Sequence, residues 1–296
     1  MALLTPASIT ELLERHALRP SRALGQHFLA DPNTARRIVR LGGVKAGDRV
    51  LEIGPGVGSL TVALAETGAS VTALELDRHV MPALAEVVAP WPDVRAVQGD
   101  ALEVDLAALL TPHNRSCVET ATSRGSSDAS SGEGAWKLVA NLPYNVATPL
   151  VARVLETAPT VGSLLVMVQR EVGERLAAAP GGRDYGAISV KVAYYGIPRV
   201  VGAVPRTVFL PPPNVDSVLV RIDRHAAPPV DVPSPDALFR LVRAGFGQRR
   251  KMLRRSLQPE LADRTLAVLD AAGVDPRQRA EALDLDAWAA VARAAA

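Results

Sequence analysis

Short apolar runs alternate with stretches of helical periodicity over most of the chain from about residue 48. The runs RVLEIG (49–54), SVTALELD (70–77), VRAVQGD (94–100), KLVANLPY (137–144) and SLLVMVQ (163–169) are predicted to be buried strands. Helix-like patterns separate several of them, such as SLTVALAETG, which ends at Gly68. This alternation is typical of a parallel sheet with helices on both faces.

The second half of the chain predicts a closing pair of strands followed by helices only. The segment YGAISVKVAYYG (185–196) fits a helix or a strand, and its small residues and the following Pro198 favour a helix. The runs PRVVGAV (198–204) and VDSVLVRI (215–222) are predicted to be strands joined by a proline-rich turn. We therefore expect an α/β fold with a doubly wound, mostly parallel sheet, an antiparallel closing strand and a small all-α C-terminal domain.

Two polar stretches divide the chain. Residues 111–135 are rich in Ser, Thr and Gly and are predicted to be a flexible insertion. Residues 223–236 contain several prolines and are predicted to be a linker. The predicted organisation is a sheet domain over 1–222 and a helical domain over 237–296.

Composition narrows the class of protein. The 296 residues, 48% of them hydrophobic, suffice for one large domain or for one domain with a small second one. Cys117 is the single cysteine, which excludes an intrachain disulfide and favours a cytoplasmic protein.

No apolar run approaches the roughly 18 residues that span a bilayer, and we expect neither a signal peptide nor a membrane anchor. The histidines show no metal-ligand spacing, so we expect no metal site. Basic and acidic residues nearly balance, 33 against 31, so net charge does not decide whether the partner is a nucleic acid.

A glycine-rich turn directly follows the first predicted strand. Gly54, Gly56 and Gly58 permit a tight turn and a close approach of the backbone to a ligand. The spacing is G-x-G-x-G, with Ser59 where a dinucleotide-binding turn has its third glycine. No G-K-[ST] sequence follows, which excludes a P-loop. For this turn alone, a structural strand-to-helix corner remains the alternative.

Polar side chains stand at the ends of the next predicted strands. Glu75, Asp100 and Asn141 occupy these positions, and in an open α/β sheet the carboxyl ends of neighbouring strands line one crevice. A carboxylate at Glu75 can accept hydrogen bonds from both hydroxyls of a ribose, and Asp100 can meet an adenine edge. Asp77 competes with Glu75, and either could be a helix cap. Together with the glycine turn, the set resembles the class I S-adenosylmethionine-dependent methyltransferases, which implies a Rossmann-like sheet and S-adenosylmethionine as the cofactor.

The sequence NLPYN (141–145) places an amide, a proline and a tyrosine where a buried strand ends. An exocyclic amine on a base is a poor methyl acceptor because its lone pair is delocalised, and two hydrogen-bond acceptors could hold its two hydrogens. Asn141 can supply a side-chain oxygen, and a carbonyl beside Pro143 can supply the other. Tyr144 can stack on a base turned out of its helix.

The alternative for these residues is an ordinary turn with a half-buried tyrosine. Because they follow the glycine turn and the two acids, the tetrapeptide resembles the motif of enzymes that methylate the N6 atom of adenine in nucleic acids.

Seven stretches resemble the small-subunit ribosomal RNA adenine N6,N6-dimethyltransferase family of the KsgA type, and they follow the family order through almost the whole chain. They are ALGQHFLAD (23–31), LEIGPGVGSLT (51–61), NLPYNVATPL (141–150), VQREVGERL (168–176), FLPPPNVDSVLVRI (209–222), FGQRRKMLRRSL (246–257) and RAEALDLDAW (279–288). The resemblance implies transfer of four methyl groups to two adjacent adenosines in a hairpin loop near the 3′ end of 16S rRNA, during biogenesis of the 30S subunit.

The same resemblance implies roles for individual residues. The implied cofactor contacts are His27, Leu29, Gly54, Gly56, Glu75, Asp100 and Asn141. The implied acceptor pocket consists of Asn141, Leu142, Pro143 and Tyr144, with Phe209 as a second aromatic wall opposite Tyr144. The chain departs from the family at His27, where Asn is usual, at Ala187, where Arg is frequent, and in the insertion at 111–135.

A dense basic cluster lies in the predicted C-terminal domain. Its members are Arg249, Arg250, Lys251, Arg254 and Arg255. The cluster is either a solvated helix face or a phosphate-binding surface, and the second alternative predicts an RNA-binding domain. The resemblance implies 16S rRNA within the 30S subunit as the partner, and we expect a monomer.

Three other functions fit parts of this sequence. A 23S rRNA adenine N6-methyltransferase is the nearest, although the C-terminal stretches favour the small-subunit type. A non-enzymatic ribosome-assembly or transcription factor could share the fold, but the intact glycine turn, Glu75, Asp100 and the 141–144 motif argue against it. A DNA adenine methyltransferase is disfavoured because no target-recognition domain is visible.

Overall fold

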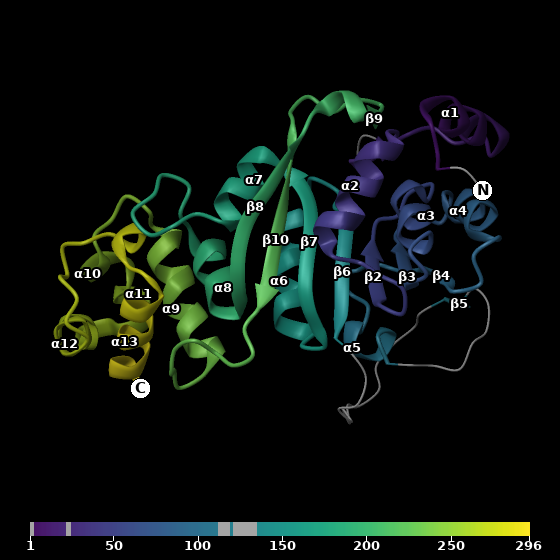
Figure 1. The fold of residues 1–296 in the computed structure, drawn as a ribbon. Coiled ribbons are helices and arrows are strands. Elements are labelled where there is room, and N and C mark those ends of the chain that lie inside the picture. Colours follow the sequence, from purple (N-terminus) through teal and green to yellow (C-terminus); the bar gives the residue numbers. More distant parts are fainter. Residues whose placement is uncertain (1–2, 22–24, 112–118, 121–134) are drawn as a thin grey trace. The chain divides into compact units, whose positions relative to one another are not determined.

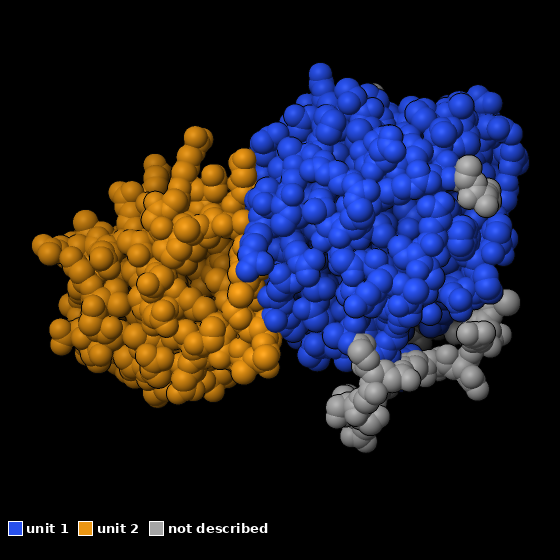
Figure 2. Space-filling model, in the orientation of Figure 1, with its two compact units in different colours: residues 1–173, 199–224 blue, residues 174–198, 225–296 orange. Residues whose placement is uncertain are grey.

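The computed structural model describes residues 3–21, 25–111, 119–120 and 135–296. The chain forms two compact units, which are coloured separately in Figure 2. The first comprises Met1–Gly173 and Arg199–Arg224, and the second comprises Glu174–Pro198 and His225–Ala296. Most of the predicted insertion, including Cys117, lies outside the described residues.

The first unit is built on a large, mostly parallel sheet (Figure 1). Its strands in the described ranges are β2 (Arg49–Ile53), β3 (Ser70–Glu75), β4 (Val94–Gln98), β5 (Glu119–Thr120), β6 (Trp136–Asn141), β7 (Val161–Gln169), β8 (Gly196–Val204) and β10 (Ser217–Arg224). They lie in the order β5-β4-β3-β2-β6-β7-β10-β8. Neighbours from β5 to β7 are parallel, whereas β10 pairs with β7 in the antiparallel direction. The predicted sheet with its antiparallel closing strand is therefore confirmed.

Helices cover both faces of this sheet. They are α2 (Pro32–Gly42), α3 (Ser59–Ala65), α4 (Met81–Val88), α5 (Leu106–Leu109), α6 (Ala147–Thr157) and α7 (Arg170–Leu176). Figure 1 shows α2 in front of the strands and α6 behind them. In α2, Asp31 caps the N-terminus by accepting a hydrogen bond from the Thr34 N–H at 2.9 Å, and the apolar stripe that includes Ile38 is buried. The aliphatic core between these layers fixes the strand ends on which the candidate site depends.

A small antiparallel sheet joins two segments that are far apart in the sequence. Strand β1 (Phe28–Leu29), which follows helix α1 (Pro6–Arg15), pairs with β9 (Phe209–Leu210), which follows the 3-10 turn η1 (Arg206–Val208). The hydrophobic pattern does not predict this pairing, because strands of two residues have no periodicity. The pairing holds the residues around β1 next to the loop that precedes β10.

The second unit is helical and has its own core. Its elements are α8 (Ala187–Tyr195), α9 (Pro235–Gly247), α10 (Leu253–Ser256), α11 (Gln258–Leu261), η2 (Ala262–Arg264), α12 (Thr265–Ala271), η3 (Ala280–Ala282) and α13 (Leu285–Ala295). Buried side chains of its core include Val190, Leu238 and Trp288. The helix favoured over 185–196 is confirmed as α8. It belongs to the unit of the C-terminal helices, whereas the sequence-based boundary at 222 left it with the sheet.

Candidate functional site

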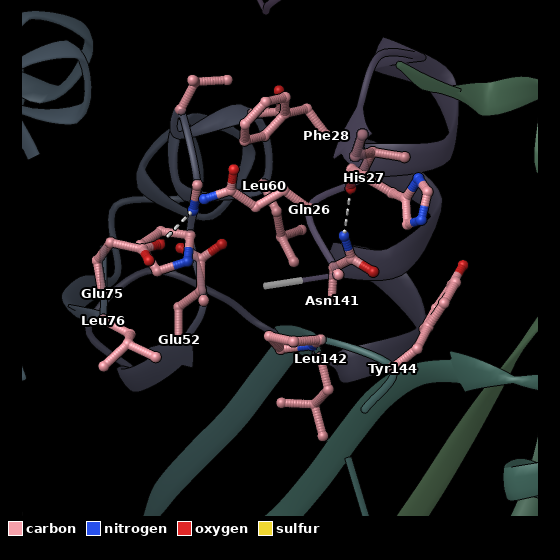
Figure 3. Close-up of a pocket in the computed structure, with 18 of the residues that line it drawn as sticks. Gln26, His27, Phe28, Glu52, Leu60, Glu75, Leu76, Asn141, Leu142 and Tyr144 are labelled. Atoms are coloured by element: carbon pink, nitrogen blue, oxygen red, sulfur yellow. Dashed lines mark hydrogen bonds between the residues drawn. The ribbon is translucent and has the colours of Figure 1, made fainter. Parts of the chain in front are cut away.

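The carboxyl ends of β2, β3 and β6 meet at one edge of the large sheet, where the strand order reverses between β2 and β6. Open α/β sheets bind their ligands at this position. A pocket opens here and encloses about 840 Å³, part of it open to solvent (Figure 3). Its lining comes from residues 25–29, the glycine turn with the end of β2, the end of β3 and residues 141–146.

The glycine turn adopts a backbone conformation that residues with a side chain rarely adopt, and it leaves little room for a Cβ. Gly54, Gly56 and Gly58 have φ angles of 70°, 55° and 93°. A Cβ on Gly56 would lie 2.8 Å from the ring of Phe28, and a Cβ on Gly54 would lie 3.3 Å from Cδ of Pro143. The turn therefore packs against the 141–144 corner, and the two motifs predicted from the sequence lie side by side.

Glu75 lies at the end of β3 and is held by the backbone. Its Oε2 accepts a hydrogen bond from the Gly56 N–H at 2.9 Å, and its Oε1 accepts one from the Asp77 N–H at 2.9 Å. Burial raises the pKa of Glu75, and these two hydrogen bonds act in the opposite direction. Asp77, the competing acid, does not line the pocket; its side chain accepts hydrogen bonds from Gln26 Nε2 and the His79 N–H.

Glu52 also lines the pocket, although the sequence motifs predict no role for it. Its side chain is buried, and its Oε2 has no hydrogen-bond partner among the described residues. Burial, reinforced by the nearby Glu75, raises the pKa of Glu52 to about 8. The signal in the sequence is a single acid inside the apolar strand RVLEI. A neutral carboxyl here can become ionised when a cation enters the pocket.

Asn141 and Tyr144 occupy fixed orientations at the end of β6. The Asn141 Nδ2 donates to the main-chain oxygen of His27 at 3.1 Å, so Oδ1 is the acceptor that the amide offers to a ligand (Figure 3). The Leu142 N–H donates to the main-chain oxygen of Met167 on β7 at 3.1 Å. The Tyr144 hydroxyl lies 2.7 Å from Ser217 Oγ, and burial raises the pKa of Tyr144. Hydrogen bonds to three other segments thus fix this corner.

His27 and Leu29 come to the pocket on the segment that contains β1. The His27 imidazole stacks against the Tyr144 ring, with centroids 5.5 Å apart and planes inclined by 30°. Its Nδ1 lies 2.8 Å from the main-chain oxygen of Pro211. The ring therefore contacts the 141–144 corner and the loop after β9.

Two of the residues expected at the site lie outside the pocket lining. Asp100 follows β4, and its carboxylate accepts a hydrogen bond from the Leu102 N–H at 2.8 Å within a turn. Phe209 is 4% exposed, pairs with Leu29 across the small sheet and packs in the core of the first unit. Their roles as adenine contact and second aromatic wall stay predictions.

The basic cluster divides into two parts. Arg249 forms an ion pair with Glu281 at 3.3 Å and donates to the Arg183 carbonyl. The other four cations are exposed, and none of them forms an ion pair with another described residue. We call these four the basic surface: Arg250, Lys251, Arg254 and Arg255. The structure thus gives Arg249 a local partner and leaves the basic surface open to a polyanion.

The described ranges contain no group of three or more His, Cys, Asp and Glu side chains that could hold a metal ion. None of the helices in those ranges is long and apolar enough to cross a bilayer.

Comparison with known proteins finds relatives over nearly the whole chain. A family model described as ribosomal RNA adenine dimethylase matches residues 18–296. The chain is 45% identical over 287 residues to a ribosomal RNA small subunit methyltransferase A from Leifsonia xyli subsp. xyli, covering 96% of both sequences.

Solved structures support the same fold. The 23S rRNA methyltransferase ErmE is 25% identical with a TM-score of 0.62, covering 90% of this chain and 98% of its own. A dimethyladenosine transferase from Plasmodium falciparum has a TM-score of 0.68 at 22% identity, covering 90% and 96%, respectively.

Proposed function

This chain belongs to the ribosomal RNA adenine dimethylase family, and from that premise we propose that it transfers methyl groups from S-adenosylmethionine to the N6 atoms of two adjacent adenosines in the 3′-terminal hairpin loop of 16S rRNA. One observation carries the proposal. The glycine turn and the 141–144 corner line one pocket, and they lie so close that a Cβ on Gly54 would come within 3.3 Å of Pro143. A methyl donor on the turn and a base at the corner would therefore be neighbours.

The walls of the pocket fit S-adenosylmethionine. The absent side chain of Gly56 lets the Phe28 ring pack against the glycine turn, and both residues line the pocket. Glu75 presents a carboxylate that its backbone partners hold in place, and its oxygens retain lone pairs for ribose hydroxyls. Glu52 presents a buried oxygen without a partner among the described residues, which suits the ammonium group of the cofactor. When bound, the cofactor supplies an electrophilic methyl group on a sulfonium centre.

The corner residues hold the acceptor amine. The Asn141 Oδ1 accepts one N6 hydrogen, because its Nδ2 is already engaged by His27. The Leu142 carbonyl, next to the rigid Pro143, accepts the other. With both hydrogens held, the nitrogen can present its lone pair to the methyl group while Tyr144 stacks on the base. The amine needs no general base before transfer, because it loses a proton readily once it is alkylated, which accounts for the neutral amide.

The basic surface of the second unit supports binding of structured RNA. Its four exposed cations can neutralise phosphates, which contributes affinity without sequence information. We propose that the 30S subunit is the assembled partner, that the protein acts as a monomer, and that it works in the cytoplasm, where these subunits are made.

A methyl-transfer assay with labelled S-adenosylmethionine tests the function. We expect label in 30S subunits that lack the modification, recovered as N6,N6-dimethyladenosine by mass spectrometry. Asn141→Ala should abolish transfer with an unchanged circular dichroism spectrum. Asn33→Ala, an exposed amide on α2, is the matched control and should retain full activity.

Other outcomes of the same assay identify the alternatives. Label in 23S rRNA alone would favour the activity named for ErmE, the structural relative at 25% identity. Absence of transfer to 30S subunits, to 23S rRNA and to duplex DNA, with cofactor binding retained, would support a non-enzymatic assembly factor.

A further inference from the structure

The family resemblance implies Asn at residue 27, where this chain has His, and the structure gives this histidine three partners. The main-chain oxygen accepts from Asn141 Nδ2 at 3.1 Å, and the imidazole stacks on Tyr144. The ring nitrogen Nδ1 lies 2.8 Å from the Pro211 oxygen. His27 thus joins both side chains that we propose to grip the adenine, and it links them to the loop after β9.

The hydrogen bond to Pro211 fixes the imidazole. A carbonyl oxygen can only accept, so Nδ1 must carry the hydrogen in this contact. The bond therefore restrains the rotation of the ring while the ring lies against Tyr144. The Tyr144 hydroxyl is held from the other direction by Ser217 Oγ at 2.7 Å. The tyrosine is restrained at its face and at its tip.

The distance between the two rings decides where a base can lie. Carbon atoms in contact are about 3.5–4.0 Å apart, so a base inserted between two rings needs roughly 7 Å between them. The centroids of His27 and Tyr144 are 5.5 Å apart. A base cannot enter that space while the rings stay in place. An adenine that stacks on Tyr144 would then use the opposite face of its ring, with His27 behind the tyrosine.

We propose that His27 is a positioning residue for the acceptor adenine: its ring backs Tyr144 and its main-chain oxygen orients the Asn141 amide. This role rests on the proposed methyl transfer and replaces the cofactor contact that the family resemblance implies for residue 27. The buried Phe209 is not needed as the partner of Tyr144 in this arrangement.

The test separates binding of the cofactor from transfer to the base. The binding constant of S-adenosylhomocysteine is measured by calorimetry, and the transfer rate is measured in single turnover with unmethylated 30S subunits at saturating cofactor. We expect His27→Ala to lower the transfer rate at least about tenfold while the binding constant changes by less than about threefold. His27→Phe retains a ring against Tyr144 and should restore the rate to within about threefold of the wild type.

A double-variant cycle provides a readout that a general loss of structure would not give. In a Tyr144→Ala background, the further change His27→Ala should lower the rate by less than about twofold, because its effect passes through the tyrosine. Equal effects of His27→Ala in both backgrounds would overturn the proposal. So would a loss of cofactor affinity of about tenfold with an unchanged saturated rate, since residue 27 would then contact the cofactor. Failure of the wild type to methylate 30S subunits would instead refute the proposed function, and the binding comparison would still decide whether His27 contacts the cofactor.

Discussion

Replacing Glu52 by Gln should change how the stability of the first unit depends on pH. Glu52 is 1% exposed, and burial, reinforced by the nearby Glu75, raises its pKa from 4.5 to about 8. A rise of this size makes the ionised carboxylate about 5 kcal/mol less favourable in the folded protein than in water. Glutamine has nearly the same shape and cannot ionise.

The direction of the effect follows from proton binding. Between the pKa of 4.5 in the unfolded chain and the pKa of about 8 in the folded one, the folded protein holds a proton on Glu52 that the unfolded chain has released. The stability linked to this proton is complete below the lower pKa and is lost as the pH rises through the higher one. Relative to Glu52→Gln, the free energy of unfolding of the wild type should therefore fall by about 1.4 kcal/mol for each pH unit in this window.

Urea unfolding followed by far-UV circular dichroism at about pH 5.5, 6.5 and 7.5 measures this slope. The quantity compared is the difference between the two proteins, in which other titrating groups largely cancel. Parallel pH dependences for wild type and variant would refute the assignment of a neutral Glu52. Saturating S-adenosylmethionine should flatten the wild-type slope, because its ammonium group favours the ionised carboxylate.

Three further changes test other parts of the site. Gly56→Ala should weaken binding of S-adenosylhomocysteine at least about tenfold by calorimetry, because the new Cβ would lie 2.8 Å from the Phe28 ring. Gly47→Ala is the control: Gly47 also has a positive φ, 80°, but a Cβ there would have no neighbour within 4 Å, so binding should be unchanged. Tyr144→Phe removes the hydrogen bond to Ser217 and should cost about 1 kcal/mol of stability in urea unfolding while most of the transfer rate remains, and inactivity would show that the hydroxyl itself is required. Replacing two cations of the basic surface by Ala should reduce the slope of log K against log salt for 16S rRNA by about 0.7–0.9 for each phosphate that the protein no longer neutralises, and an unchanged slope would remove this surface from RNA binding.

The sequence predicts the large sheet well, because strands of a parallel sheet are buried on both faces and appear as continuous apolar runs. The site motifs are predictable for a related reason: Gly54, Glu75 and Asn141 each come directly after or at the end of such a run. The assignment of α8 to the second unit was not predictable, because its apolar residues are not gathered on one face and its sequence therefore favours neither core.

The sequence does not reveal contacts that depend on distant segments. The His27 imidazole is positioned by Pro211, 184 residues away, through a pairing of two-residue strands. The lack of a hydrogen-bond partner at Glu52 Oε2 among the described residues can be seen only when the surrounding strands are in place. Arg249 looks like its basic neighbours in the sequence, and its ion pair with Glu281 depends on how the helices of the second unit pack.

The chain passes from the first unit to the second and back again, and this order affects when the 141–144 corner can form during synthesis. After Gly173 the chain contributes Glu174–Pro198 to the second unit, and only then returns to complete the sheet. The glycine turn and the 141–144 corner are thus synthesised long before Pro211 and Ser217. Pro211 forms a hydrogen bond with His27, and Ser217 forms one with Tyr144. A nascent chain that has not reached these residues lacks the supports that orient its tyrosine. The hydrogen bonds of Pro211 and Ser217 at this corner can therefore form only after about three quarters of the chain has been translated.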